Sequence, residues 1–226
     1  MFFYDSTILL LIPALLIASY AQYKVSSTFS KFSKIPNKNG YTGGEVARII
    51  LDRHGLSDIP VIPVRGQLTD HYDPNKKSIS LSEPVYNSSS ISSIAVAAHE
   101  VGHAIQDQEG YMALRLRNSL VPVVNFSSQM VWILFLAGIF FSLPKLVTAG
   151  ILLFTTTVAF QIITLPVEIN ASRRAMASLS QGDFVDQQEY GQATKVLKAA
   201  AFTYIASTLV ALTQLLRLIL INNRRR

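Results

Sequence analysis

The sequence predicts a mainly α-helical integral membrane protein with about four transmembrane helices and one small α+β domain. Four stretches carry no charged residue, namely 6–23, 118–144, 146–167 and 199–216. Each reaches or exceeds the roughly 17–20 residues that cross a bilayer core as a helix. Half of the 226 residues are hydrophobic and 15% are charged, too much apolar sequence for the core of a soluble chain of this length. The first stretch lacks a basic n-region and a cleavage site, so we expect a retained anchor.

The polar block between the first two spans predicts a small α+β domain. Thr42 and Glu45 have the spacing of a capping box at the start of a short helix. Residues 61–64 are strand-like, and Pro63 favours an edge position in the sheet. Residues 67–72 and 78–81 are strand-like, and a turn at 73–77 that begins with Asp-Pro-Asn separates them. This pattern predicts a β-hairpin. Its free edge could hold an extended peptide.

A His-Glu-x-x-His motif follows the hairpin. His99 and His103 are one helical turn apart on one face of a helix predicted over about 90–109, so both imidazoles can reach one ion. Glu100 lies between them, where it can take a proton from a water on that ion. In the alternative interpretation, the two histidines are ordinary hydrogen-bonded helix residues that bind no metal. Gly102 is costly inside a helix and predicts a close approach by another backbone or by substrate.

The predicted metal is Zn2+, one ion per chain, in a zincin-like catalytic domain. There is no cysteine, so any metal must use histidine and carboxylate. Catalytic zinc takes three protein ligands, and we expect Glu168 to be the third. Two further membrane crossings return it to the side of the histidines, where it directly follows the third span and opens a helix.

Several polar residues have more than one possible role. Glu168 could be an ordinary first-turn glutamate beside lipid head groups. Asp107, Asp70 and His71 are weaker candidate ligands, and His54 is expected to be a helix-capping or surface residue. Candidate donors to the oxyanion of a peptide-bond cleavage are His71, Tyr72, Arg173 and Arg174. Candidates for orienting a histidine are Asn170, Ser172 and Asp107.

The motifs resemble those of the YugP-type neutral zinc membrane metallopeptidases of bacteria. The resemblance rests on Ala-Ala-His-Glu-Val-Gly-His-Ala-Ile-Gln at 97–106, on Leu-Pro-Val-Glu-Ile-Asn-Ala-Ser-Arg-Arg-Ala at 165–175, and on the hairpin sequences at 68–74 and 81–87. It covers essentially the whole chain. It implies a membrane-embedded zinc peptidase with His99 and His103 as ligands and Glu100 as base. The HtpX-type membrane peptidases are more distantly similar, but their Glu-x-x-x-Asp pattern has Ser172 in place of Asp here.

These observations divide the chain into five expected segments. They are transmembrane helix 1 (1–23), the catalytic α+β domain (24–117), transmembrane helices 2 and 3 (118–167), a third-ligand helical segment (168–198), and transmembrane helix 4 with a basic C-terminus (199–226). The expected partners are a peptide or membrane-protein substrate and the lipid bilayer; no nucleic-acid motif is present. Oligomeric state is left open.

Basic residues near the span ends favour a multi-pass cell-membrane protein with a cytoplasmic active site. Most lie on the side of the predicted site, and Lys145 and the three terminal arginines, with Arg217 reaching towards them, lie on the other. A second function class is a non-enzymatic multi-pass membrane protein with a structural or vestigial zinc site. The intact Glu100 argues against it, because a structural zinc has no use for that carboxylate.

Overall fold

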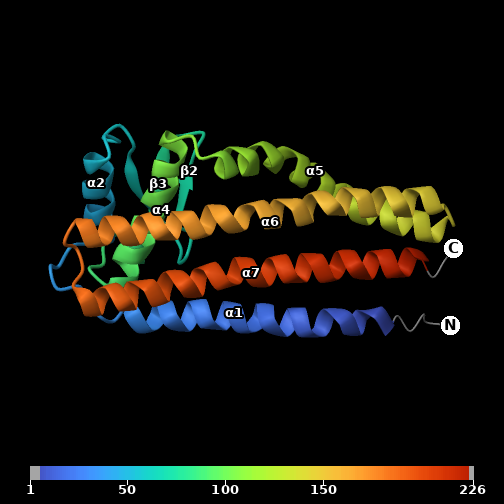
Figure 1. Ribbon diagram of the computed structural model, residues 1–226, viewed down its shortest axis with the longest axis horizontal. Helices are drawn as coiled ribbons and strands as arrows, with labels where there is room; N and C mark the ends of the chain where they lie inside the picture. The colour runs from blue at the N-terminus through green and yellow to red at the C-terminus, as the bar shows by residue number, and fades with distance from the viewer. Residues whose placement is uncertain (1–5, 224–226) are drawn as a thin grey trace.

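Four long helices run along the molecule (Figure 1). They are α1 (Leu11–Phe32), α5 (Met112–Phe140), α6 (Pro144–Gln181) and α7 (Gln187–Asn223), and a short 3-10 helix, η1 (Ser6–Leu10), precedes α1. The structure is a computed structural model that describes residues 6–223. All four helices are long and apolar enough to cross a membrane, which confirms the predicted number of spans. The terminal arginines 224–226 lie outside the described residues.

Large apolar side chains face outward along these helices. Leu16 is 65% exposed, Phe126 62%, Phe140 80% and Leu152 64%. Apolar surface of this extent is unfavourable in water, whereas it is favourable against lipid chains. The protein is therefore an integral membrane protein whose helical bundle is largely covered by lipid.

A small α+β domain sits at one end of the bundle, in blue and green in Figure 1. Its elements are α2 (Gly43–Arg53), β1 (Val61–Val64), β2 (His71–Asp73), β3 (Ser78–Ser82), α3 (Glu83–Tyr86) and α4 (Ile91–Gln108). The sheet order is β1-β3-β2, with β1 parallel and β2 antiparallel to β3. The hairpin prediction is confirmed, and Pro63 lies in an edge strand as expected.

The predicted helix starts are made by side-chain caps. The Thr42 hydroxyl accepts a bond of 3.2 Å from the Glu45 backbone N–H, and Glu45 accepts one of 2.8 Å from the Thr42 backbone N–H. This is the capping box expected from the sequence. At α4, Ser90 is the cap and accepts from the Ser93 N–H at 3.2 Å. The helix that carries the His-Glu motif therefore begins and ends within one residue of its predicted limits.

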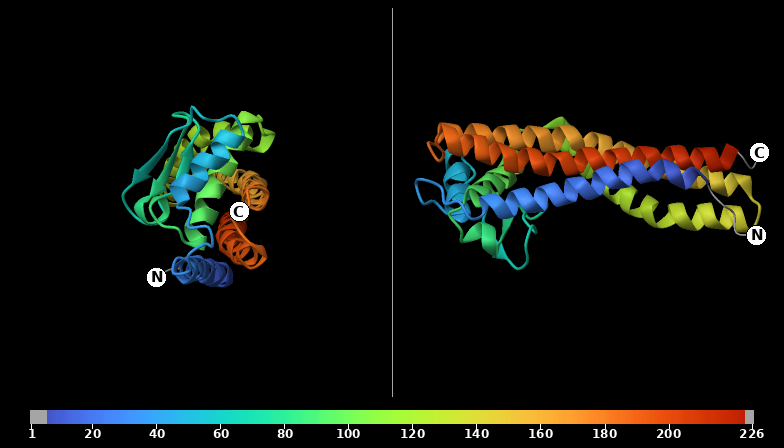
Figure 2. Two further views of the ribbon diagram at one scale, coloured as in Figure 1. Left: turned by 90° about the vertical axis from the view of Figure 1, so that its left-hand side faces the viewer. Right: turned by 90° about the horizontal axis from the view of Figure 1, so that it is seen from below.

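Helix α4 lies at the centre of the domain, between the sheet and α6 (Figure 2). Ile79 of β3 and Val101 of α4 belong to the same buried core as Leu179 of α6 and Val196 of α7. The core is thus shared between the domain and the near ends of the long helices. Burial of apolar area is the main contribution to the stability of a fold, so this shared core fixes the position of the domain relative to the bundle.

One local prediction was wrong. Glu168 does not open a helix, because α6 continues without interruption from Pro144 to Gln181 with Pro166 inside it. A proline removes one helical hydrogen bond, but packed membrane helices tolerate that loss. Helices α5 and α7 are likewise continuous through residues 117–118 and 198–199, so charge alone does not mark where a helix ends.

Gly102 marks the closest contact between α4 and α6. A Cβ on this residue would lie 2.6 Å from the backbone oxygen of Ala171. That distance is too short, and the obstructing atom belongs to a helix backbone that cannot rotate away. The predicted reason for this glycine, close approach by another backbone, is confirmed.

We predict that Gly102→Ala lowers stability by about 1–3 kcal/mol, because overpacking pushes α6 away from α4. The expected sign is opposite to helix propensity, which favours alanine by about 0.8–1 kcal/mol. Gly191→Ala in α7 is the matched control, since nothing lies within 4 Å of its added Cβ, and it should be neutral or stabilising. The measurement is the apparent unfolding midpoint in detergent. A Gly102→Ala protein as stable as the Gly191→Ala protein would contradict the steric account.

Candidate metal centre

Three candidate metal ligands from two helices meet beside the domain. Nε2 of His99 lies 3.2 Å and Nε2 of His103 lies 3.6 Å from Oε2 of Glu168. One ligand atom from each of the three residues lies within 4.8 Å of the others. Glu168 is 3% exposed and His103 8%. The expected juxtaposition of Glu168 with the histidines is therefore present, although Glu168 reaches it from the middle of α6.

A hydrogen-bond chain sets the orientation of His103. Nε2 of Gln106 donates to the Val167 carbonyl at 2.8 Å and to Oδ1 of Asn170 at 2.9 Å. Its Oε1 therefore faces Nδ1 of His103, 3.0 Å away, and must accept a hydrogen bond from the N–H at that nitrogen. Protonation at Nδ1 leaves the lone pair of Nε2 directed towards Glu168. A histidine that binds a metal through Nε2 needs this tautomer.

His99 is held by a different partner. The Ser172 hydroxyl lies 3.2 Å from its Nδ1. Of the candidates for orienting a histidine, Ser172 thus contacts one directly, and Asn170 acts through Gln106, a residue that was not among those candidates. Its spacing of three residues from His103 on one helix was an available signal. Asp107 faces elsewhere, since it accepts from the Tyr72 hydroxyl at 2.7 Å and pairs with Lys77.

Glu100 lines the same cavity as the two histidines. It is 8% exposed, and its Oε2 accepts a bond of 3.0 Å from the Tyr72 backbone N–H. Burial raises the pKa of Glu100 to about 7; His99 and the Tyr72 bond lower it, whereas Glu168 and Asp70 raise it. A carboxyl group with a pKa near neutrality can both accept and release a proton at physiological pH.

The β2–β3 hairpin contacts Glu100 through a backbone N–H group, and most of its polar side chains bond to other residues. The phenol of Tyr72 is committed to Asp107, and burial together with that bond raises its pKa. His71 lines the same cavity as Glu100, but its Nδ1 contacts the Thr69 carbonyl at 2.8 Å. Asp70 accepts from the backbone N–H of Ser82 at 2.7 Å and so fixes β2 to β3. His54 is the C-cap of α2, as predicted.

The two arginines expected near the reaction lie outside this cavity. Arg174 forms a bidentate pair with Glu109 at 2.8 and 2.7 Å and also donates to Asn170. It thus supports the chain of bonds that ends at His103. Arg173 is exposed and lines a separate groove between α6 and α7.

Two polar residues of the cavity were missed in the sequence. The cavity has a volume of about 200 Å³ and includes Arg117 of α5 and Tyr204 of α7 beside the three candidate ligands and Glu100. Nη1 of Arg117 lies 3.5 Å from Oε1 of Glu168. In the sequence Arg117 reads as a basic residue at a span end, and Tyr204 falls within an apolar run, so neither stands out without the packing.

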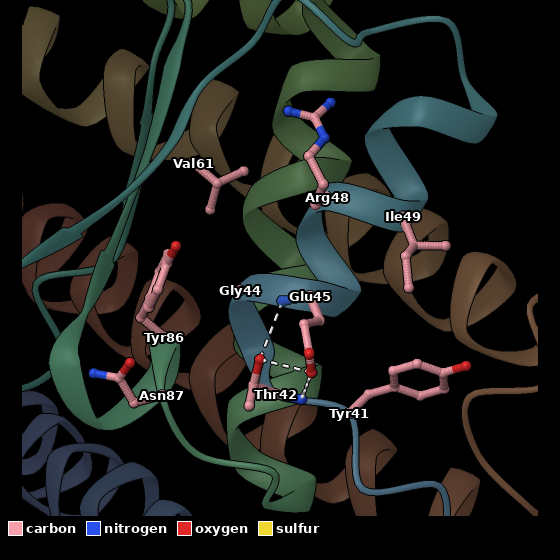
Figure 3. Close-up of a pocket in the computed structure, with 9 residues that line it drawn as sticks. All are labelled: Tyr41, Thr42, Gly44, Glu45, Arg48, Ile49, Val61, Tyr86 and Asn87. Carbon is pink, nitrogen blue, oxygen red and sulfur yellow. Dashed lines mark hydrogen bonds between the residues drawn. The ribbon is translucent and has the colours of Figure 1, made fainter.

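A larger cavity of about 550 Å³ lies between α2 and β1, away from the histidines (Figure 3). The Thr42 and Glu45 groups on its wall bond to each other in the capping box. This cavity is lined by no histidine and by one carboxylate, that of Glu45, whereas His99, His103 and Glu168 all line the smaller cavity.

The donor set fits Zn2+. Two imidazole nitrogens and one carboxylate are the protein ligands of a common class of catalytic zinc sites. Each imidazole has its second nitrogen engaged, as zinc-binding histidines require. The cavity beside the three ligand atoms leaves room for a further ligand.

Comparison with known proteins agrees with this geometry. The model of the family described as "Putative neutral zinc metallopeptidase" matches residues 7–223. The chain is 52% identical over 214 residues to a protein of Bacillus subtilis (strain 168) named "Putative membrane protease YugP", with 95% of each chain covered. No solved structure matches. The chain therefore belongs to this neutral zinc metallopeptidase family.

Proposed function

We propose that the protein is a membrane-embedded, zinc-dependent metalloprotease that hydrolyses peptide bonds close to the membrane surface. His99, His103 and Glu168 are the proposed ligands and Glu100 the proposed base. The observation that carries the proposal is the convergence of the two oriented imidazoles with a buried carboxylate from a distant helix. The family match supports the same conclusion.

When bound, Zn2+ acts as a Lewis acid that makes water nucleophilic near neutral pH and polarises the scissile carbonyl. Glu100 takes the proton of the attacking water and passes it to the leaving amine. The Tyr72 N–H holds Oε2 of Glu100, which leaves Oε1 to exchange the proton. The pKa of about 7 suits both halves of this transfer.

Arg117 and Tyr204 are the proposed donors to the negative charge that develops on the carbonyl oxygen. Both line the cavity, and the Nε atom of Arg117 is buried without a hydrogen-bond partner in the described part of the chain. A fixed cation or hydroxyl in a water-poor site stabilises such charge strongly. They replace Arg173 and Arg174 in this role, because those two arginines face away.

The substrate is proposed to be a peptide segment near the bilayer, and the site is proposed to face the cytoplasm. Glu168 and Arg117 lie at the ends of charge-free runs, so the cavity is close to the membrane surface. Among described residues, Lys24, Arg115, Arg117, Arg173, Arg174, Lys195 and Lys198 lie near span ends on the domain side, against Lys145 and Arg217 on the other. This asymmetry follows the positive-inside rule.

A non-enzymatic membrane protein with a structural zinc is the other function considered. A structural site does not require a buried carboxyl group of raised pKa beside its ligands. Glu100→Gln separates the two functions, because it removes the proposed base and leaves the proposed ligands.

We expect Glu100→Gln to retain zinc and to lose at least about 100-fold in peptidase rate, since the general base is gone. The rate is measured on labelled casein with protein in proteoliposomes, and zinc by mass spectrometry of the purified protein. Glu83→Gln, an exposed change on α3, is the control and should match the wild type. Full activity in Glu100→Gln would refute the mechanism.

We expect Glu168→Ala to weaken zinc binding as strongly as His103→Ala does. Gln106→Ala should have a smaller effect, roughly 10–100-fold, because it removes only the residue that orients His103. Zinc retained after challenge with graded chelator is the measurement. Asp107→Ala and His71→Ala should keep their zinc. Normal retention in Glu168→Ala would exclude it as a ligand, and loss in His71→Ala alone would move the third ligand to the hairpin.

Topology can be tested with single cysteines, because the chain has none of its own. If the domain is cytoplasmic, a membrane-impermeant maleimide added to intact cells should label Ser142→Cys, in the turn between α5 and α6, and spare Ser57→Cys on the domain. Permeabilised cells, in which both must react, are the control. The reverse labelling pattern would place the site outside.

A further inference from the structure

A groove between α1 and α7 is lined by four lysines and three aromatic side chains, the third of which is Phe32. Its volume is about 590 Å³, and it includes Lys24, Lys31, Lys195, Lys198, Tyr20 and Phe202. Lys24 and Lys31 are two turns apart on one face of α1, about 10 Å along the axis. The two helices lie side by side along their length (Figures 1 and 2). The lysines therefore form one patch rather than separate surface charges.

These four lysines have no carboxylate partner within residues 6–223, and no acidic side chain lines the groove. Two of them rest against rings instead. Nζ of Lys24 is 5.6 Å from the ring centroid of Tyr20, and Nζ of Lys31 is 5.5 Å from that of Phe32. Four like charges that line one groove repel one another unless an anion lies among them.

The groove crosses the expected edge of the bilayer. The charge-free run of α1 ends at residue 23, directly before Lys24, and that of α7 begins at residue 199, directly after Lys198. Just inside these limits, Tyr20 and Phe202 meet edge to face, with ring centroids 6.2 Å apart. Aromatic rings prefer this level of a membrane. The groove thus has an apolar end at the lipid and a cationic end just outside it.

We propose that this groove binds the phosphate-bearing headgroup of an anionic phospholipid, held between the lysines of α1 and α7. The membrane is the source that fits, because the apolar end opens where acyl chains begin and a soluble phosphate has no use for it. Such a lipid would join the first and last membrane helices, which are far apart in sequence. The site is separate from the proposed metal centre, so the proposal does not depend on peptidase activity.

The test compares lipids retained by the full-length protein in native mass spectrometry, with dioleoylphosphatidylglycerol against dioleoylphosphatidylcholine. The wild type should prefer the anionic lipid. The preference should fall at least about 10-fold in K24Q/K31Q/K195Q/K198Q, because each lysine contributes to attraction of an anionic headgroup. The control K34Q/K38Q/R65Q/K76Q removes the same charge from exposed residues outside the groove and should keep the preference.

Two further arms keep the result decisive. K24R/K31R/K195R/K198R retains the charge and should bind like the wild type, which separates charge from a folding defect. Glycerol phosphate without acyl chains should not compete. An unchanged preference in the glutamine variant, an equal loss in the control, a loss in the arginine variant or competition by glycerol phosphate would each overturn the proposal.

Discussion

The backbone contact between α4 and α6 at Gly102 is the constraint on which the rest of the structure depends. A helix pair separated by an ordinary side chain would leave Glu168 too far from His99 and His103 to share an ion with them. Because this glycine follows His99 by three residues and precedes His103, the point of closest approach lies within the motif itself. The same contact brings Val167 and Asn170 to Gln106, so the orientation of His103 depends on it too.

The polar groups that lead from the domain surface to the site form a connected set. Glu109 pairs with Arg174, Arg174 donates to Asn170, and Asn170 accepts from Gln106, whose other end faces His103. A buried group without a partner is costly, so each member restricts the next to one orientation. The chain begins at the exposed Glu109 and ends at the candidate ligand His103, so it connects the solvent-exposed surface of the domain to the candidate metal centre.

The long helices line the candidate site as well as anchoring the protein in the membrane. Helix α6 carries Glu168, α5 supplies Arg117 and α7 supplies Tyr204, so each long helix except α1 contributes a wall of the cavity. Helix α1 packs along α7, and the two form the basic groove at the level of the lipid headgroups. Domain and bundle share one buried core, and the site occupies the seam between them.

The sequence by itself determined the features that depend on local patterns. Charge-free runs of sufficient length predict the spans, Thr42 and Glu45 cap α2, and the spacing of His99 and His103 puts both imidazoles on one helical face. Two membrane crossings separate Glu168 from His99 and His103, and this even number predicts that all three residues lie on the same side of the membrane. Only the tertiary structure decided that α6 runs unbroken through Pro166, that Gln106 rather than Asp107 orients a histidine, and that Arg117 and Tyr204 face the cavity while Arg173 and Arg174 do not. These outcomes depend on which faces of distant helices meet, and that is set by packing across the bundle, which no local pattern of residues encodes.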